Sequence, residues 1–245
     1  MNFLSDQEGI MTRYLKEKEN WDEHLEKSRE YILKSVGNKK LSTISILGSG
    51  WLLDVPLEEL TIQFQKVILV DIFHPPQILH KVRNMPRVKT MEMDITGGMI
   101  EQVYSLVKES KKRKTKPALS TLEAKGFIPQ FNPGYVVSLN ILNQLDILIV
   151  DYVKRYLTYD DDEILSFRKR IQQSHLDSLP KDRSCLITDF EEWTYDRDQL
   201  VSKKPLVYIL LPEGKRKSSW TWKFDLHKTY HEGKITHFKV IAQEY

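Results

Sequence analysis

Cysteine is almost absent from this chain, which has 245 residues and only one thiol, that of Cys185. A single thiol cannot form an internal disulfide or supply a cysteine-rich metal site. Cys185 stands in an apolar run with Leu186 and Ile187. Because buried thiols behave as small apolar side chains, we expect a structural cysteine in the core and not a nucleophile.

Long apolar runs are also missing. No apolar segment approaches the roughly 18 residues needed to span a bilayer. The first residues, from Met1 to Glu8, lack the basic start and the apolar stretch of a signal peptide. These absences lead us to expect a cytoplasmic protein that does not contact a membrane.

A strong charge of one sign is missing as well. Lysine and arginine number 37 and aspartate and glutamate 34, which gives a formal net charge of +3. A dedicated nucleic-acid binder usually shows a basic stripe or a much larger excess, so nucleic acid is not the expected partner. The basic run 111–116 either contacts phosphates or an acidic partner, or is a solvated loop. The sequence does not determine the oligomeric state.

Zinc-binding patterns are not evident among the seven histidines. His227 and His231 are four residues apart and would share one face of a helix, but the surrounding sequence does not favour a helix. We therefore expect no metal site.

Short apolar runs that alternate with amphipathic segments dominate what is present. Such alternation is typical of a parallel sheet covered by helices on both faces, so we predict a doubly wound α/β fold. The tail contains two apolar runs with no helix between them, which predicts an antiparallel pair at a sheet edge. The predicted strands are 44–47, 67–71, 88–93, 135–139, 184–189, 206–211 and 235–243, and the predicted helices are 10–36, 55–65, 75–84, 98–110, 141–156 and 160–176.

Polar or glycine residues stand at the ends of the first four predicted strands. Gly48 and Gly50 follow the first strand, while Asp71, Asp94 and Asn140 end the next three. Glycine lets the backbone turn tightly and approach a ligand. Ligands of doubly wound sheets bind beyond the carboxyl ends of the strands, near the point where the strand order reverses. An acidic side chain there can accept both hydroxyls of a ribose or meet an adenine amino group, so we expect one nucleotide crevice.

These positions resemble the motifs of the class I S-adenosylmethionine-dependent methyltransferases. Leu47 to Gly50 is similar to the glycine-rich first motif, Val70-Asp71 to the ribose-binding second motif, and Met93 to Ile95 to the adenine-contacting third motif. Ser138 to Asn140 stands where the fourth motif lies, beside the methionine part of the cofactor.

The resemblance covers roughly residues 40–245, and it implies a Rossmann-like domain there, after an N-terminal helical extension over 1–39. It further implies a mostly parallel seven-stranded sheet with an antiparallel C-terminal strand pair, S-adenosylmethionine as cofactor, and a small molecule or a protein as methyl acceptor. The cofactor-binding residues that it implies are Gly48, Ser49, Gly50, Asp71, Ile72, Asp94, Ile95 and Asn140.

Two other functions stay open at this stage. Leu52 stands where the family's third glycine would be, with Asp54 close by, so the domain could keep the fold as a non-catalytic binding module. The dinucleotide fingerprint Gly-x-Gly-x-x-Gly would need a glycine at Leu53, and a nicotinamide enzyme is therefore less favoured.

The sequence does not assign a catalytic residue. Asp189 and Glu191 follow the fifth strand and are candidates for a general base from their position alone. Trp51, Tyr135 and Trp193 are candidates for the walls of an acceptor pocket, or they pack as ordinary aromatic side chains. The extension either covers the site or the sheet edge, or serves only for packing.

Overall fold

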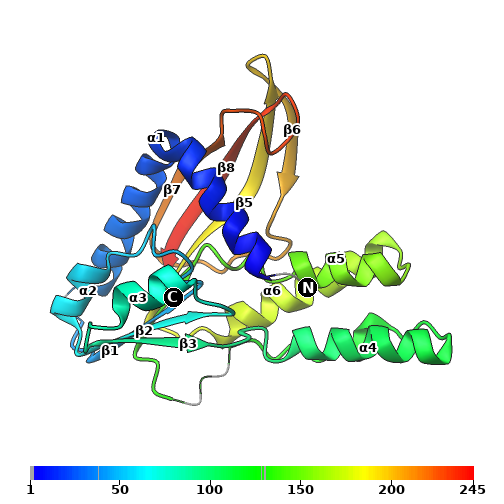
Figure 1. The fold of residues 1–245 in the computed structure, drawn as a ribbon, viewed down its shortest axis with the longest axis horizontal. Coiled ribbons are helices and arrows are strands. Elements are labelled where there is room, and N and C mark those ends of the chain that lie inside the picture. Colours follow the sequence, from blue (N-terminus) through cyan, green and yellow to red (C-terminus); the bar gives the residue numbers. More distant parts are fainter. Residues whose placement is uncertain (1–2, 38, 128, 130) are drawn as a thin grey trace.

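One sheet of eight strands runs through the protein, as described by a computed structural model for residues 3–37, 39–127, 129 and 131–245, without the side chains of Leu4 and Asp6 (Figure 1). The strand order is β3-β2-β1-β4-β5-β8-β7, and β6 pairs separately with β5. Strands β1 to β5 pair in parallel, whereas β8 is antiparallel to β5 and β7. The strands are β1 Thr43–Leu47, β2 Lys66–Asp71, β3 Val88–Glu92, β4 Tyr135–Leu139, β5 Ser184–Asp196, β6 Gln199–Pro205, β7 Lys215–Asp225 and β8 Ile235–Glu244.

Helices cover both faces of this sheet. Strand β2 illustrates why, because Ile68 and Val70 join the core on one face while Val67 and Leu69 join the core on the other. A strand buried on both faces must be apolar throughout, and the predicted doubly wound α/β fold is thereby confirmed. The helices are α1 Phe3–Val36, α2 Leu57–Gln63, α3 Pro76–Val82, α4 Met99–Arg113, α5 Ile147–Tyr156 and α6 Asp161–Ser178, with a short 3-10 helix at Leu119–Thr121. Within the described ranges, no helix has the length and apolarity needed to cross a bilayer.

The C-terminal part of the sheet differs from the prediction in two respects. The antiparallel pair at the edge is present, but β7 forms it with β8, and the predicted strand 206–211 is wrong. That segment is apolar because Val207, Ile209 and Leu211 pack against the core on the α4–α6 side. The additional strand β6 is exposed along its whole length, so it carries no apolar pattern. Because β6 is added to the seven other strands, the sheet has eight strands and not seven.

Helix α1 begins at Phe3, earlier than predicted, and is kinked at Glu17, whose backbone is not helical (φ −107°, ψ 15°). The buried carboxylate of Glu17 accepts hydrogen bonds from the backbone N–H groups of Leu226 at 3.2 Å and His227 at 2.9 Å. The C-terminal half of α1 packs beside β7, where the indole of Trp21 donates to the carbonyl of Phe224 at 2.8 Å. The kink turns the N-terminal half across the carboxyl ends of the central strands (Figure 1). Residues 1, 2 and 38 of the predicted extension 1–39 lie outside the described residues.

Candidate functional site

A cavity of about 500 Å³ opens at the carboxyl ends of the central strands. It lies where the chain order of the sheet reverses, since β1 is flanked by β2 on one side and β4 on the other. This is the position at which doubly wound sheets bind ligands. The eight residues proposed from the sequence all line this one cavity, namely Gly48, Ser49, Gly50, Asp71, Ile72, Asp94, Ile95 and Asn140.

The turn after β1 needs glycine for packing reasons as well. Gly48 has a positive φ of 80°, and a Cβ there would lie 2.7 Å from the carbonyl oxygen of Leu139. Gly50 also has a positive φ, of 41°, and its N–H points at the carboxylate of Asp71, with a distance of 2.8 Å between nitrogen and Oδ2. The turn is therefore held between the ends of β2 and β4, with its backbone facing the cavity.

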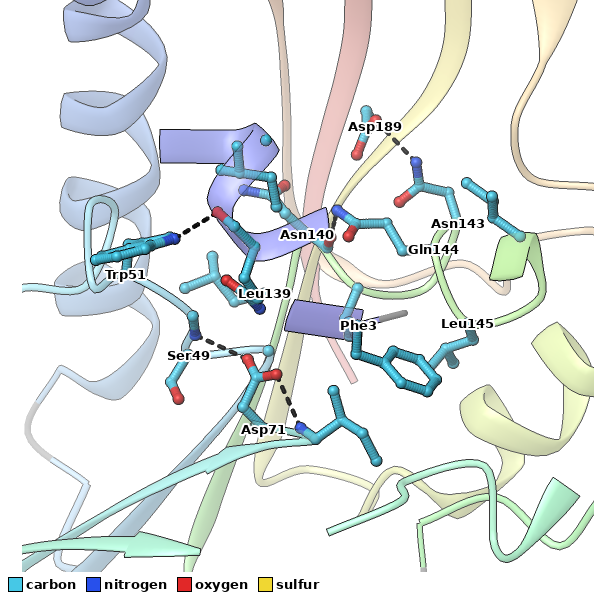
Figure 2. Close-up of a pocket in the computed structure, with 18 of the residues that line it drawn as sticks. Phe3, Ser49, Trp51, Asp71, Leu139, Asn140, Asn143, Gln144, Leu145 and Asp189 are labelled. Carbon is cyan, nitrogen blue, oxygen red and sulfur yellow. Dashed lines mark hydrogen bonds between the residues drawn. The ribbon is translucent and has the colours of Figure 1, made fainter. Parts of the chain in front are cut away.

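Asp71 is fixed by two backbone hydrogen bonds. Its Oδ2 accepts from Gly50 and its Oδ1 accepts from the N–H of Ile72, each at 2.8 Å (Figure 2). Burial raises the pKa of this carboxyl, while the hydrogen bond from Gly50 opposes the increase. Because each carboxylate oxygen can accept two hydrogen bonds, one lone pair on each oxygen remains for a ligand.

The carboxylate of Asp94 also accepts hydrogen bonds at the beginning of α4. Its Oδ1 accepts hydrogen bonds from the backbone N–H of Thr96 at 2.9 Å and from the hydroxyl of the same residue, and its Oδ2 lies 3.4 Å from the backbone nitrogen of Ile100. The contact with Ile100 meets one of the first N–H groups of α4, which have no partner within the helix. The carboxylate thus holds the loop that brings Ile95 to the cavity wall.

Asn140 ends β4 in a left-handed conformation, with φ at 47°. Its side-chain nitrogen donates to Asp54 Oδ2 at 2.8 Å and lies 3.4 Å from Nε2 of His24 on α1. The indole of Trp220 donates to the other ring nitrogen of His24 at 3.0 Å. Burial lowers the pKa of His24 to about 3, so this imidazole is neutral. No sequence motif points to His24, which lies 116 residues from Asn140.

The far half of the cavity is aromatic and comes from elements outside the sequence motifs. Trp21 of α1 lines it together with Trp222, Phe224 and Phe238 of the two last strands. Asp189 of β5 also lines the cavity and is only 3% exposed. Distant segments of the chain therefore build this wall.

Only some of the residues predicted as pocket walls or as a general base line the cavity. Trp51 lines the cavity, and its indole donates to the carbonyl of Gln7 on α1 at 2.7 Å. The prediction of Tyr135 as a wall residue is wrong, because Tyr135 lies in the core with none of its surface exposed. Trp193 is also wrong, since its ring packs against two lysine side chains away from the cavity. Glu191 accepts a hydrogen bond from the indole of Trp193.

The other polar clusters noted in the sequence lie elsewhere. His227 contacts Glu17 at 2.6 Å and His231 contacts Glu192 at 2.8 Å. Among the residues that the structure describes, no three His, Cys, Asp or Glu side chains are arranged to hold a metal ion. In the basic run, the Lys116 ammonium pairs with Glu163 at 3.0 Å.

Comparisons with known proteins give little beyond this geometry. No family model matches the sequence, and neither does any curated protein. Among solved structures, the chain is similar to the N-methyltransferase NodS from Bradyrhizobium japonicum WM9 in complex with S-adenosyl-L-homocysteine. The match has 12% sequence identity and a TM-score of 0.39, and it covers 90% of this chain and 87% of that chain. This likeness is too distant to carry an argument, so the case for function depends on the residues around the cavity.

Proposed function

We propose that this cavity binds S-adenosylmethionine and that the protein transfers its methyl group to an acceptor. One observation supports this most directly. The residues picked from four separate strand ends, on the basis of the methyltransferase motifs, line a single cavity at the reversal point of the sheet. Its volume of about 500 Å³ falls within the usual range for ligand pockets, roughly 300–1,000 Å³.

The residues present suit the chemistry of this cofactor. In our proposal Asp71 accepts the two ribose hydroxyls with the lone pairs that Gly50 and Ile72 leave open. Asp94 and Ile95 lie along the wall assigned to the adenine. Asn140 lies on the side assigned to the methionine part, and its buried Oδ1 has no partner among the described residues. An unpaired buried acceptor is costly, and a bound ammonium group would satisfy it.

Methyl transfer requires mainly that the protein align the acceptor and exclude water from the site. A sulfonium is already an activated methyl donor, so the cofactor supplies the reactive carbon. The protein has to hold the acceptor in line with that carbon and exclude water. The N-terminal half of α1 contributes Phe3, Gln7 and Ile10 to the cavity lining and so shields the site from solvent.

Calorimetric titration of the purified protein with S-adenosylmethionine, S-adenosylhomocysteine and NAD tests the proposal. Binding of the two sulfur compounds without binding of NAD supports it. Binding of NAD alone would assign the cavity to a dinucleotide enzyme. A folded protein that binds none of the three would be a binding module without this catalytic function, and the proposal would be abandoned.

The variant Asp71→Asn makes the test specific to the site. We expect at least tenfold weaker binding of S-adenosylhomocysteine, because a charge-assisted hydrogen bond is worth about 1.5–3 kcal/mol. The matched control is Asp151→Asn, which makes the same charge change on an exposed position of α5. Equal affinity in wild type and Asp71→Asn, with both proteins folded by circular dichroism, would refute the assignment of Asp71.

A further inference from the structure

Three buried oxygen atoms of residues that line the cavity lack hydrogen-bond donors. They are Oδ1 of Asp189, Oδ1 of Asn143 and Oδ1 of Asn140, and none has a partner among the described residues. Buried polar atoms are almost always paired, so each such exception calls for an explanation. All three atoms are acceptors. The ammonium group of the cofactor would satisfy Asn140 Oδ1, and a second ligand with N–H donors would satisfy the other two.

Asp189 is held in place by the residue beside it. Its Oδ2 accepts a hydrogen bond from the side-chain nitrogen of Asn143 at 2.9 Å, and its Oδ1 is left free (Figure 2). The pairing of β5 with β8 shifts register between Asp189 and Glu191. Such a bulge re-aims side chains, and here the carboxyl group lines the cavity. Figure 2 shows Asn140, Asn143 and Asp189 on the same side of the cavity.

The aromatic rings that line the same cavity favour a cation on an apolar body. Trp222, Phe224 and Phe238 line this half of the cavity, and aromatic faces attract positive charge. Arg13 already lies over the ring of Phe224 at 5.1 Å, but its guanidinium is 4.0 Å from the fully buried carboxylate of Asp225. The charge of Arg13 is therefore compensated within the protein, and it does not offset the attraction for a ligand cation.

We propose that the methyl acceptor is an amine with an apolar or aromatic body, bound in this aromatic half with its nitrogen against Asp189 Oδ1. The proposal rests on the proposed function and names its substrate class. With the cofactor bound, Asn140 Oδ1 pairs with the cofactor's ammonium group, whereas Asp189 Oδ1 and Asn143 Oδ1 stay free. The ammonium group of the acceptor can donate to both, but a hydroxyl offers one donor and would leave one of them unpaired.

Asp189 would also accept the proton that must leave the acceptor. Its carboxylate takes one proton from the ammonium group and becomes a carboxylic acid, which leaves a neutral amine with a free electron pair. That pair forms the new nitrogen–carbon bond as the bond between methyl carbon and sulfur breaks, and the electrons of the broken bond stay on sulfur. The products are a methylated ammonium ion and a thioether. Burial raises the pKa of Asp189 to about 7, which makes it a stronger base than an ordinary carboxylate.

The charges around Asp189 determine how binding should vary with pH. Glu192 on the same strand raises the pKa of Asp189, and His231 pairs with Glu192 at 2.8 Å. Burial raises the pKa of Tyr230 to about 12, and the charge of Asp189 also acts on it, so this phenol stays neutral near pH 7. Asp189 itself gains charge between pH 6 and pH 8. We expect amine affinity to rise over this interval.

The test uses protein saturated with S-adenosylhomocysteine and three pairs of probes, each an amine and its matched alcohol. The pairs are benzylamine with benzyl alcohol, 2-phenylethylamine with 2-phenylethanol, and cyclohexylmethylamine with cyclohexylmethanol. Calorimetry at pH 8 should show at least one amine binding tenfold or more tightly than its alcohol. With S-adenosylmethionine, mass spectrometry should detect the N-methylated product of that amine. No preference for amines in any pair would overturn the inference.

Asp189→Asn separates this inference from the proposed function. We expect the variant to lose at least tenfold in amine affinity and its rise between pH 6 and pH 8, yet to bind S-adenosylhomocysteine within twofold of wild type. Asp151→Asn should change neither affinity. A variant that instead loses S-adenosylhomocysteine would show that Asp189 holds the cofactor and not the acceptor. If wild type fails to bind S-adenosylhomocysteine at all, the proposed function fails and this inference fails with it.

Discussion

Asp189→Asn should also change how the stability of the protein depends on pH. Burial raises the pKa of Asp189 from the usual 3.8 to about 7 in the folded protein. The folded state then binds this proton more tightly than the unfolded chain does. The stability that this carboxyl contributes is complete below pH 3.8 and is lost as pH rises to 7. At 1.36 kcal/mol for each unit of pKa difference, the whole loss is about 4 kcal/mol, and about 3 kcal/mol of it falls between pH 5 and pH 8.

Urea unfolding at pH 5 and pH 8 measures this loss directly. Asparagine cannot ionise, so the variant should gain about 3 kcal/mol relative to wild type on going from pH 5 to pH 8. Comparing the two pH values cancels the cost of any new contact that the amide makes, because that cost is the same at both. Asp151→Asn, on an exposed face of α5, should show no such difference. An equal effect of Asp189→Asn at both pH values, with unchanged denaturant slopes, would refute a buried carboxyl of raised pKa.

Two further substitutions test the packing of the turn and the kink. Gly48→Ala should destabilise the fold by about 2–4 kcal/mol, because its Cβ would lie 2.7 Å from the Leu139 carbonyl oxygen at a positive φ. Gly9→Ala is the matched control, since it has open space in a helix, and it should stabilise by up to about 1 kcal/mol; equal melting temperatures for the two variants would contradict this account. Burial raises the pKa of Glu17, but hydrogen bonds from His227 outweigh this effect and lower the pKa to about 2. The stability that this carboxylate contributes to the fold is therefore present above pH 4.5 and is lost as pH falls towards 2. Glu17→Gln should lose about 3 kcal/mol at pH 7 and speed hydrogen exchange over residues 3–16, and an unchanged exchange rate there would argue against a kink held by this carboxylate.

Continuous apolar runs were a reliable guide to the parallel strands. Val67 to Val70 is apolar throughout because its side chains are buried on both faces, and such a run predicts a central strand. Apolar runs were less reliable in the tail. The run Leu206 to Leu211 is apolar because several of its side chains pack on the core, yet its backbone does not join the sheet. Periodicity reports which side chains are buried and not which backbone groups pair.

The two halves of the site also differed in how well the sequence predicted their residues. Gly50, Asp71 and Asn140 could be picked because parallel strands bring their carboxyl ends to one edge of the sheet. His24, Trp222 and their neighbours could not be picked, because they come from a helix and from the last strands. No spacing rule joins a residue on α1 to residues that follow it by about 200 positions.

The amino-acid sequence by itself determined the layered sheet and the row of polar positions at its strand ends. Both follow from local order, since burial dictates which residues are apolar and each strand end follows directly from its strand. The tertiary structure alone decided what closes the cavity. Glu17 bends α1 through hydrogen bonds to a loop more than 200 residues away. Asp189 stands at a bulge of β5 and lines the same cavity as aromatic rings from β7 and β8. Such contacts arise only when distant segments pack together, because no local pattern encodes which partner each segment meets.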